Sequence, residues 1–240
     1  MGRWDLSRFP VPRMGETARD MFEEKCVLMR FPCGHLFKLA TLSNKRAAKD
    51  SEEALATVVL SAIAVEAFIN DFAFAVAGLS TKESPSSLSE LVDAHRSRGW
   101  KRRSLDTKIL TMFKLLTKRD LPKNDQLRKA FALLVELRNM LVHMKTEKIV
   151  YPAPSAHPLY DRLTAQGLTL ETFPRDRSCP SVLLAHCQVA EWSLRTAMAT
   201  ARLLLEAMPE CTTANAVVRL FAPLFYSEAD GLGQARHRGV

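Results

Sequence analysis

The pattern of apolar and polar residues changes near residue 50. Residues 51–78 form a nearly continuous apolar run, and Asp50-Ser-Glu-Glu53 at its start resembles a capping box, in which side chains satisfy the first backbone N–H groups of a helix. Gly78 is typical of the position that follows the last helical turn. The pattern predicts one long helix over 50–78 that is apolar on nearly every side.

Such a helix is either a membrane span or the centre of a helical bundle. Glu66, Asn70 and Asp71 interrupt the apolar run, and charged side chains at the depth of a bilayer are costly. The interruptions favour a central helix that partner helices bury, and we expect no membrane association.

Cap residues and prolines delimit further amphipathic helices. We expect these helices from Ser87 to before Gly99, from Ser104 through Leu116, from Asn124 or Asp125 to about Lys145, over 181–208 between Pro180 and Pro209, and over 212–220. Five of the twelve prolines lie in 152–180, so 148–180 is predicted to be a loop-rich excursion with one short helix near Leu159–Ala165.

The first fifty residues have a different pattern. Two short apolar stretches, CVLMRF and HLFKLATL, flank Pro32-Cys33-Gly34, which favours two short strands around a turn. The expected organisation is an N-terminal extension over 1–50 with a short hairpin, a helical bundle over 51–227 and a flexible tail over 228–240. The fold class is all-α, with about five main helices.

Composition narrows the class of protein without naming a function. The 240 residues are 47% hydrophobic and 25% charged, which excludes wholesale disorder, and the net charge of +8 is compatible with a nucleic-acid partner. The N-terminus has no continuous apolar stretch, so we expect no secretory signal and a cytoplasmic location.

The five cysteines are scattered and form no C-x-x-C pair, which favours free thiols. Cys33-Gly-His35 and His186-Cys187 are the pairs that come nearest to a metal-ligand pattern. A structural zinc site needs two closely spaced ligand pairs in favourable geometry, and neither supplies them. We expect no metal and no cofactor.

One helical segment combines residues with catalytic potential. The sequence LVELRNMLVHMK places Arg138, Asn139 and His143 on the helix predicted over 124–145. Arg138 lies at the edge of the apolar stripe of that helix, and Asn139 and His143 share a face because they are four residues apart. Five residues of about 100° each separate Arg138 from His143 by roughly 140° around the axis, so the two side chains border one sector.

An arginine at the edge of an apolar stripe needs an anionic partner, because an unpaired buried charge is costly. Glu66, in the middle of the most apolar helix, has the same need with the opposite sign. We expect Glu66 to lie near Arg138 and to orient it.

Signatures of hydrolases with a G-x-S-x-G motif, of P-loop and dinucleotide-binding proteins and of H-E-x-x-H metalloproteases do not occur in the chain. An arginine, an asparagine and a histidine without an acidic metal site favour metal-independent cleavage of RNA, which supplies its own 2′-OH nucleophile. A histidine can transfer the proton, and a guanidinium can stabilise the charge that develops on the phosphate. The expected products are a 2′,3′-cyclic phosphate and a 5′-hydroxyl.

The spacing R-x-x-x-x-H occurs twice, since Arg30 and His35 also match it. Pro32 and Gly34 indicate that the first copy is not helical, whereas the second lies deep in a well-capped helix. We take only the second copy as a candidate site.

The sequence RNMLVH resembles the R-N-x-x-x-H signature of the HEPN superfamily (higher eukaryote and prokaryote nucleotide-binding domains), with supporting similarity over 51–147. The resemblance implies an all-α bundle, usually a homodimer, in which two signature helices form one composite ribonuclease site. It also implies that Arg138 binds phosphate, that Asn139 is its polar support and that His143 is the acid–base residue. Many members are toxins or antiviral defence effectors, so an antitoxin or defence-system protein is an expected partner.

A basic segment between two predicted helices, RSRGWKRR, is a candidate RNA-binding surface. Cations beside an exposed aromatic ring can bind backbone phosphates and stack a base. The alternative is a solvated loop with its tryptophan in the core. The candidate RNA-binding residues are Arg96, Arg98, Trp100, Lys101, Arg102, Arg103 and, after the signature helix, Lys145.

Two other functions remain open at this point. Some members of the family lack cleavage activity, so the chain could be a helical module that binds RNA or a protein. It could also be a plain structural bundle in which RNMLVH is accidental.

Overall fold

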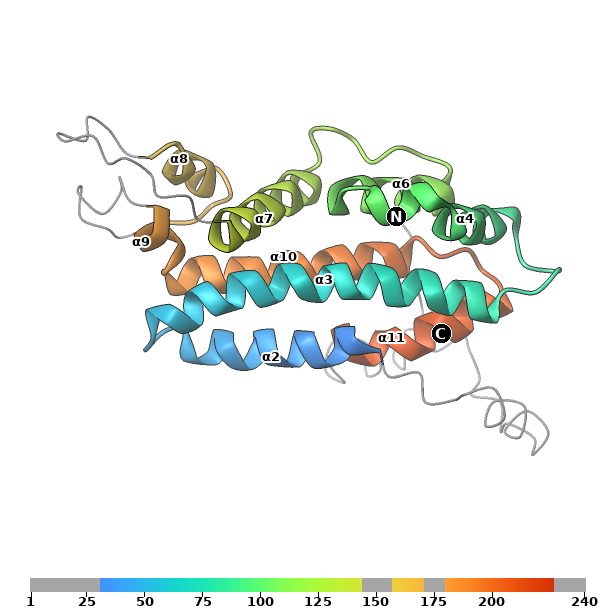
Figure 1. Ribbon diagram of the computed structural model, residues 1–240, viewed down its shortest axis with the longest axis horizontal. Coiled ribbons are helices and arrows are strands. Elements are labelled where there is room, and N and C mark those ends of the chain that lie inside the picture. The colour runs from blue at the N-terminus through green and yellow to red at the C-terminus, as the bar shows by residue number, and fades with distance from the viewer. Residues whose placement is uncertain (1–30, 144–156, 171–179, 227–240) are drawn as a thin grey trace, which may run out of the picture.

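The computed structural model describes residues 31–143, 157–170 and 180–226, and every regular element in these ranges is a helix (Figure 1). The all-α class is therefore confirmed, with ten helices in the described ranges where about five main ones were expected. They are α2 (Pro32–Arg46), α3 (Ser51–Leu79), α4 (Ser86–Arg96), α5 (Arg98–Arg102), α6 (Leu105–Thr117), α7 (Gln126–Val142), α8 (Pro158–Thr164), α9 (Pro180–Leu184), α10 (Cys187–Glu206) and α11 (Thr212–Phe225).

The helices form three layers around α3. Helices α3 and α10 run side by side through the middle of the molecule, α2 and α11 lie along one side of them, and α4, α6 and α7 lie along the other (Figure 1). Both α3 and α10 carry small buried residues, which allow two helices to approach closely. These small residues are Thr57, Ser61, Ala62 and Ala64 on α3 and Ala190, Ser193, Ala197 and Ala201 on α10.

Helix α3 is the long helix that the apolar run predicted. The Asp50 side chain accepts a hydrogen bond from the backbone N–H of Glu52 at 2.9 Å, which confirms the N-terminal cap. The helix ends at Leu79, one residue later than expected, so Gly78 belongs to its last turn.

A cluster of phenylalanine rings joins α3 to the layer formed by α2 and α11. The Phe68 ring lies 5.3 Å from that of Phe221 and 5.2 Å from that of Phe225, both nearly edge-on. Phe37 of α2 packs edge-on against Phe225 at 4.8 Å. These geometries are favourable for aromatic pairs and add to the gain from burying the rings.

Among the described helices, α3 is the one that is long and apolar enough to cross a membrane. In the fold, 56% of its most apolar 18-residue window is buried inside the protein. Contacts with α2, α7, α10 and α11 provide that burial. The structure is therefore compatible with a water-soluble helical protein whose central helix is covered by its neighbours.

The hairpin expected around Pro32-Cys33-Gly34 is wrong for the described part of the segment, because Pro32–Arg46 is a helix. Pro32 occupies the first turn, where a missing backbone N–H costs nothing. Phe31 at the N-cap provides no side-chain cap, and Asp71 of α3 accepts the backbone N–H of Cys33 at 3.0 Å instead. Residues 32–46 consequently pack in the same core as the described residues between 51 and 226, so this part of the chain is not a separate extension.

Two other boundaries also differ from expectation. The helix expected over 181–208 is divided into α9 and α10, because His186 is extended and its Nδ1 accepts the backbone N–H of Gln188 at 3.2 Å. Helix α4 begins at Ser86, directly after Pro85, so Ser87 does not cap the helix that was expected to start there and is buried inside its first turn.

The other predicted caps are confirmed. Ser104 accepts a hydrogen bond from the Thr107 backbone N–H, and Asp125 accepts one from the Arg128 backbone N–H. The short helix expected near Leu159–Ala165 is α8. The tail over 228–240 and most of 148–180 lie outside the described residues.

The contact between Asp71 and Cys33 predicts a pH-dependent stability. Burial raises the pKa of the Asp71 carboxyl above its usual value, against the opposing effect of its hydrogen bonds to Cys33. Because the folded-state pKa is raised, stability from this group is full below the unfolded value and falls as the pH rises through the folded value. We expect wild type to lose stability relative to Asp71→Asn as the pH rises above about 4, as measured by urea denaturation.

Asp71→Ala is the matched variant, since it removes the charge and also the acceptor for the Cys33 N–H. We expect it to unfold with a free energy about 1 kcal/mol lower than Asp71→Asn at neutral pH. Equal stability of the two variants would show that Asp71 does not cap α2.

Candidate active site

The candidate site lies at the C-terminal end of α7. The buried face of this helix carries Ala130, Phe131, Leu133, Leu134 and Leu137 and packs against α3 and α10. This packing fixes the rotation of α7 about its axis and places the next residue, Arg138, at the boundary between core and solvent. Its side chain is 31% exposed.

The Arg138 guanidinium is held from two sides. Its Nη2 lies 3.5 Å from Oε2 of Glu66, and its Nη1 donates a hydrogen bond to Oδ1 of Asn139 at 3.0 Å. The expected proximity of Glu66 and Arg138 is therefore present in the structure. A guanidinium has five N–H donors, more than these two contacts use, so Arg138 can also bind an oxyanion.

His143 directly follows α7 and is its C-cap residue. Its backbone N–H donates to the carbonyl of Asn139 at 2.9 Å, and its side chain is exposed. The helix ends at Val142, three residues before the expected Lys145, which lies outside the described residues. The structure thus brings Glu66, Arg138 and Asn139 into contact and leaves the His143 imidazole free to meet a ligand at the end of the same helix.

The first copy of the R-x-x-x-x-H spacing is partly different from expectation. His35 lies inside α2 and is exposed, so Pro32 and Gly34 do not prevent a helix there. Arg30 lies outside the described residues. Pro32 begins the helix, so this copy spans a helix start, whereas Arg138 and His143 share the last turns of one helix.

The basic segment over 96–103 differs from the expected RNA-binding surface in the position of its tryptophan. Trp100 is only 1% exposed, so it belongs to the core and cannot stack a base as part of an RNA-binding surface. Its ring is flanked by His95 and by Nζ of Lys108, each 6.0 Å away. The five cations Arg96, Arg98, Lys101, Arg102 and Arg103 are exposed around it, on α4, on α5 and directly after α5.

These cations are not part of the Arg138 site. Figure 1 places α4 at one end of its layer and the C-terminal end of α7 at the other. Lys108 is a residue that the sequence interpretation missed. It occupies the apolar stripe of α6 with Ile109, Met112 and Phe113, and a lysine at such a position is a signal that the sequence does contain.

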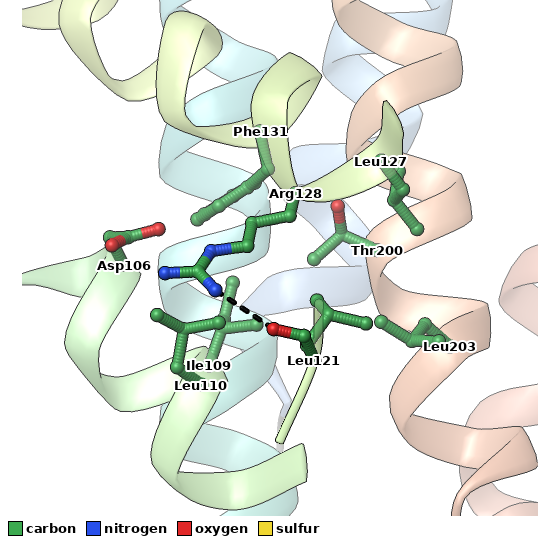
Figure 2. Close-up of a pocket in the computed structure, with 9 residues that line it drawn as sticks. All are labelled: Asp106, Ile109, Leu110, Leu121, Leu127, Arg128, Phe131, Thr200 and Leu203. Carbon is green, nitrogen blue, oxygen red and sulfur yellow. Dashed lines mark hydrogen bonds between the residues drawn. The ribbon is translucent and has the colours of Figure 1, made fainter. Parts of the chain in front are cut away.

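A pocket between α6, α7 and α10 is too small for a substrate. Its volume is about 10 Å³, which is room for a single water molecule (Figure 2). Arg128 reaches from α7 over the cavity and donates a hydrogen bond from Nη1 to the carbonyl of Leu121 at 2.8 Å. The lining of this pocket includes none of Arg138, Asn139 and His143, so the pocket is not part of the candidate site.

The described part of the chain contains no group of three or more His, Cys, Asp or Glu side chains that could hold a metal ion. Cys33 is fully buried, and burial, followed by the adjacent Asp71, raises the pKa of its thiol far above the usual value. The thiol is thus protonated and unreactive at neutral pH. His157 and His186 cap α8 and α10 through Nδ1 and so have structural roles.

No family model, no curated protein and no solved structure matches this chain.

The contact between Glu66 and Arg138 predicts a measurable coupling. Both side chains are about a third or more exposed, so the pair is expected to contribute about 0.2–1 kcal/mol. We expect that value from a double-mutant cycle of Glu66→Gln and Arg138→Gln, measured by chemical denaturation.

The bidentate pair of Glu136 and Arg162 is the matched control. Its two hydrogen bonds, at 2.5 and 2.6 Å, attach α8 to α7, and we expect a larger coupling there because both oxygens are engaged. A zero coupling between Glu66 and Arg138, with a clear one in the control pair, would show that Glu66 does not hold the guanidinium.

Proposed function

We propose that this protein is a metal-independent endoribonuclease of HEPN type. The observation that supports the proposal is the arrangement at the end of α7, where Glu66 and Asn139 hold a partly exposed Arg138 and an exposed His143 follows one turn later. This combines an oxyanion-binding guanidinium with an imidazole that can accept and donate a proton, and these are the two requirements for cleaving RNA through its own 2′-OH.

Each residue has a defined role in the proposed reaction. A His143 imidazole accepts the proton of the 2′-OH, and the oxygen attacks the adjacent phosphorus. The bond from phosphorus to the 5′-oxygen breaks, and that oxygen takes a proton from an acid. Arg138 binds the non-bridging oxygens and stabilises their charge in the transition state, while Glu66 and Asn139 keep its guanidinium in place.

The reaction favours a homodimer. In-line attack places the entering and leaving oxygens on opposite sides of the phosphorus, so the base and the acid must act from two directions. Each chain supplies one signature histidine. A second copy of α7 across a twofold axis would provide the second imidazole and a second guanidinium.

The helices of the site also carry exposed apolar side chains. Phe74 of α3 is 52% exposed and Val142 of α7 is 49% exposed. Glu66, Asn70 and Phe74 are four residues apart, so they share one face of α3. These exposed apolar side chains are suited to an interface between two copies that encloses the site between them.

The family resemblance adds a biological setting to the proposal. We place the enzyme in the cytoplasm, as a toxin or an antiviral defence effector, with RNA as its substrate and an antitoxin or another defence-system protein as a partner. The net charge of +8 supports binding to RNA, because phosphates along the strand attract a basic protein.

An RNA cleavage assay in EDTA tests the activity. We expect wild type to cleave RNA without a divalent metal and to leave 2′,3′-cyclic phosphate and 5′-hydroxyl ends. His143→Ala and Arg138→Ala should each lower the rate at least about 100-fold, as is typical when an acid–base or oxyanion-binding group is removed.

Two variants serve as controls in the same assay. His35→Ala removes the exposed histidine of the other R-x-x-x-x-H copy, and Arg195→Ala removes an exposed arginine on α10, so both should cleave like wild type. Cleavage that needs a metal, or that survives His143→Ala, contradicts the proposal. RNA binding without products would indicate an inactive binding module.

The proposed dimer makes a second prediction. Val142→Glu and Phe74→Glu each place a charge at one of these exposed apolar positions. We expect both variants to shift the protein from dimer to monomer in light scattering and to abolish cleavage. Leu42→Glu, at a 41% exposed position on α2, is the control and should remain dimeric. A fully active monomer would exclude a composite site.

A further inference from the structure

A second concentration of positive charge lies where α4 meets α5. A pocket of about 340 Å³ opens there to solvent, and its six lining residues contain five basic side chains, one serine and no acid. These residues are His95, Arg96, Ser97, Arg98, Lys101 and Arg102. The C-terminal end of α4 favours nearby cations at His95 and Arg96, but it does not explain the three that follow on α5.

Beneath the pocket lie the nitrogen-bearing side chains of His95, Trp100 and Lys108. His95 packs edge-on against the buried Trp100, and Nζ of Lys108 lies over the same ring. Lys108 is only 7% exposed, and its ammonium forms no ion pair and no hydrogen bond within the described residues. In those residues, Nδ1 of His95 and Nε1 of Trp100 are also buried and have no hydrogen-bond partner.

Such an arrangement is costly for a purely structural element. A mostly buried lysine is normally paired with a carboxylate, and a buried nitrogen such as Nε1 of Trp100 normally finds a hydrogen-bond partner. Burial, and then the positive charges of Lys108, Arg96 and Lys101, lower the pKa of His95. The pocket is therefore a region of uncompensated positive potential, which a bound anion would relieve.

We propose that this pocket binds the phosphate groups of a single-stranded RNA, away from the Arg138 site. The exposed arginines and Lys101 bind successive phosphates, and Lys108 strengthens the field from below. Guanidinium groups match the geometry of phosphate oxygens, and several cations in a row suit a polyanion better than a single ion.

The surroundings favour RNA over a lipid surface. The exposed large apolar residues of the described chain lie on α2, α3, α7, α9 and α11, and none lies on α4, α5 or α6. A membrane-bound surface usually inserts apolar side chains beside its cations. Because Trp100 is buried, binding uses the phosphates without stacking a base and is independent of base sequence. The choice of RNA rests on the proposed function.

Binding of an uncleavable RNA separates this pocket from the catalytic site. The probe is a fluorescein-labelled, fully 2′-O-methylated oligonucleotide, which has no 2′-OH to react, and the readout is fluorescence anisotropy. We expect Arg98→Gln/Lys101→Gln to weaken binding at least about tenfold. The slope of log K against log salt concentration should become about 1.4 less steep, since each phosphate contact on a single strand contributes about 0.7 to that slope.

The matched control is Lys45→Gln/Lys49→Gln, which removes the same charge from exposed positions at the end of α2 and beyond it. We expect this pair to bind within about twofold of wild type. An equal loss of affinity in both double variants would show that binding depends only on net charge and would overturn the proposal that this pocket binds RNA. Preferential binding to phosphatidylserine vesicles instead of RNA would also overturn it.

Lys108→Met tests the buried layer. Methionine keeps the aliphatic stem in the core and removes the ammonium, so we expect RNA affinity to fall at least about threefold with no loss of thermal stability. Lower stability with unchanged affinity would assign Lys108 a structural role and contradict the proposal. RNA binding through this pocket without any cleavage of ordinary RNA would overturn the proposed enzyme and leave the pocket in place.

Discussion

Helix α3 is apolar around most of its circumference, and the rest of the fold exists to remove that surface from water. With a hydrophobic gain of about 25 cal/mol per Å² of buried apolar area, leaving it exposed would cost more than a small domain can tolerate. Each neighbour of α3 answers this requirement in its own way. Helix α10 approaches closely along small residues, and α2 and α11 interlock with α3 through phenylalanine rings. Even the start of α2 depends on α3, because Asp71 provides its cap.

The same constraint creates the candidate site. Once α7 buries its apolar face against α3 and α10, the rotation of the helix is fixed, and Arg138 must lie at the rim of the core. A charge at the rim needs a partner, and the central helix supplies Glu66. The residue that interrupts the apolar run of α3 is therefore the one that holds the guanidinium. The candidate site and the core packing share this contact, so two packed helices set the position of the guanidinium.

Within the described residues, charged side chains are paired at one end of the layer formed by α4, α6 and α7 and unpaired around the basic pocket at the other. At α7, Glu66 pairs with Arg138, and Glu136 makes a bidentate contact with Arg162. At α4 and α5, five basic residues and the buried Lys108 surround a pocket with no acidic lining. Paired charges stabilise or orient parts of the chain, whereas unpaired charges of one sign retain their attraction for an external ligand. On the proposed function, the first end performs chemistry and the second holds the strand.

Features that depend on interactions between residues close together along the chain could be predicted from the sequence. The period of the apolar residues and the caps at Asp50, Ser104 and Asp125 act within a few residues, so the all-α class and most of the helices could be predicted. The need of Arg138 for an acidic partner also follows from its position on the stripe, and Glu66 was identifiable as the acid inside the apolar helix. Features that depend on contacts between residues far apart in the chain appear only in the packed structure. The start of α2 is capped by the Asp71 carboxylate, 38 residues beyond the Cys33 N–H that it accepts, and Trp100 is buried with His95 of α4 and Lys108 of α6 against its ring. Burial and long-range capping are properties of the packed molecule, so the pattern of neighbouring residues along the chain does not predict them.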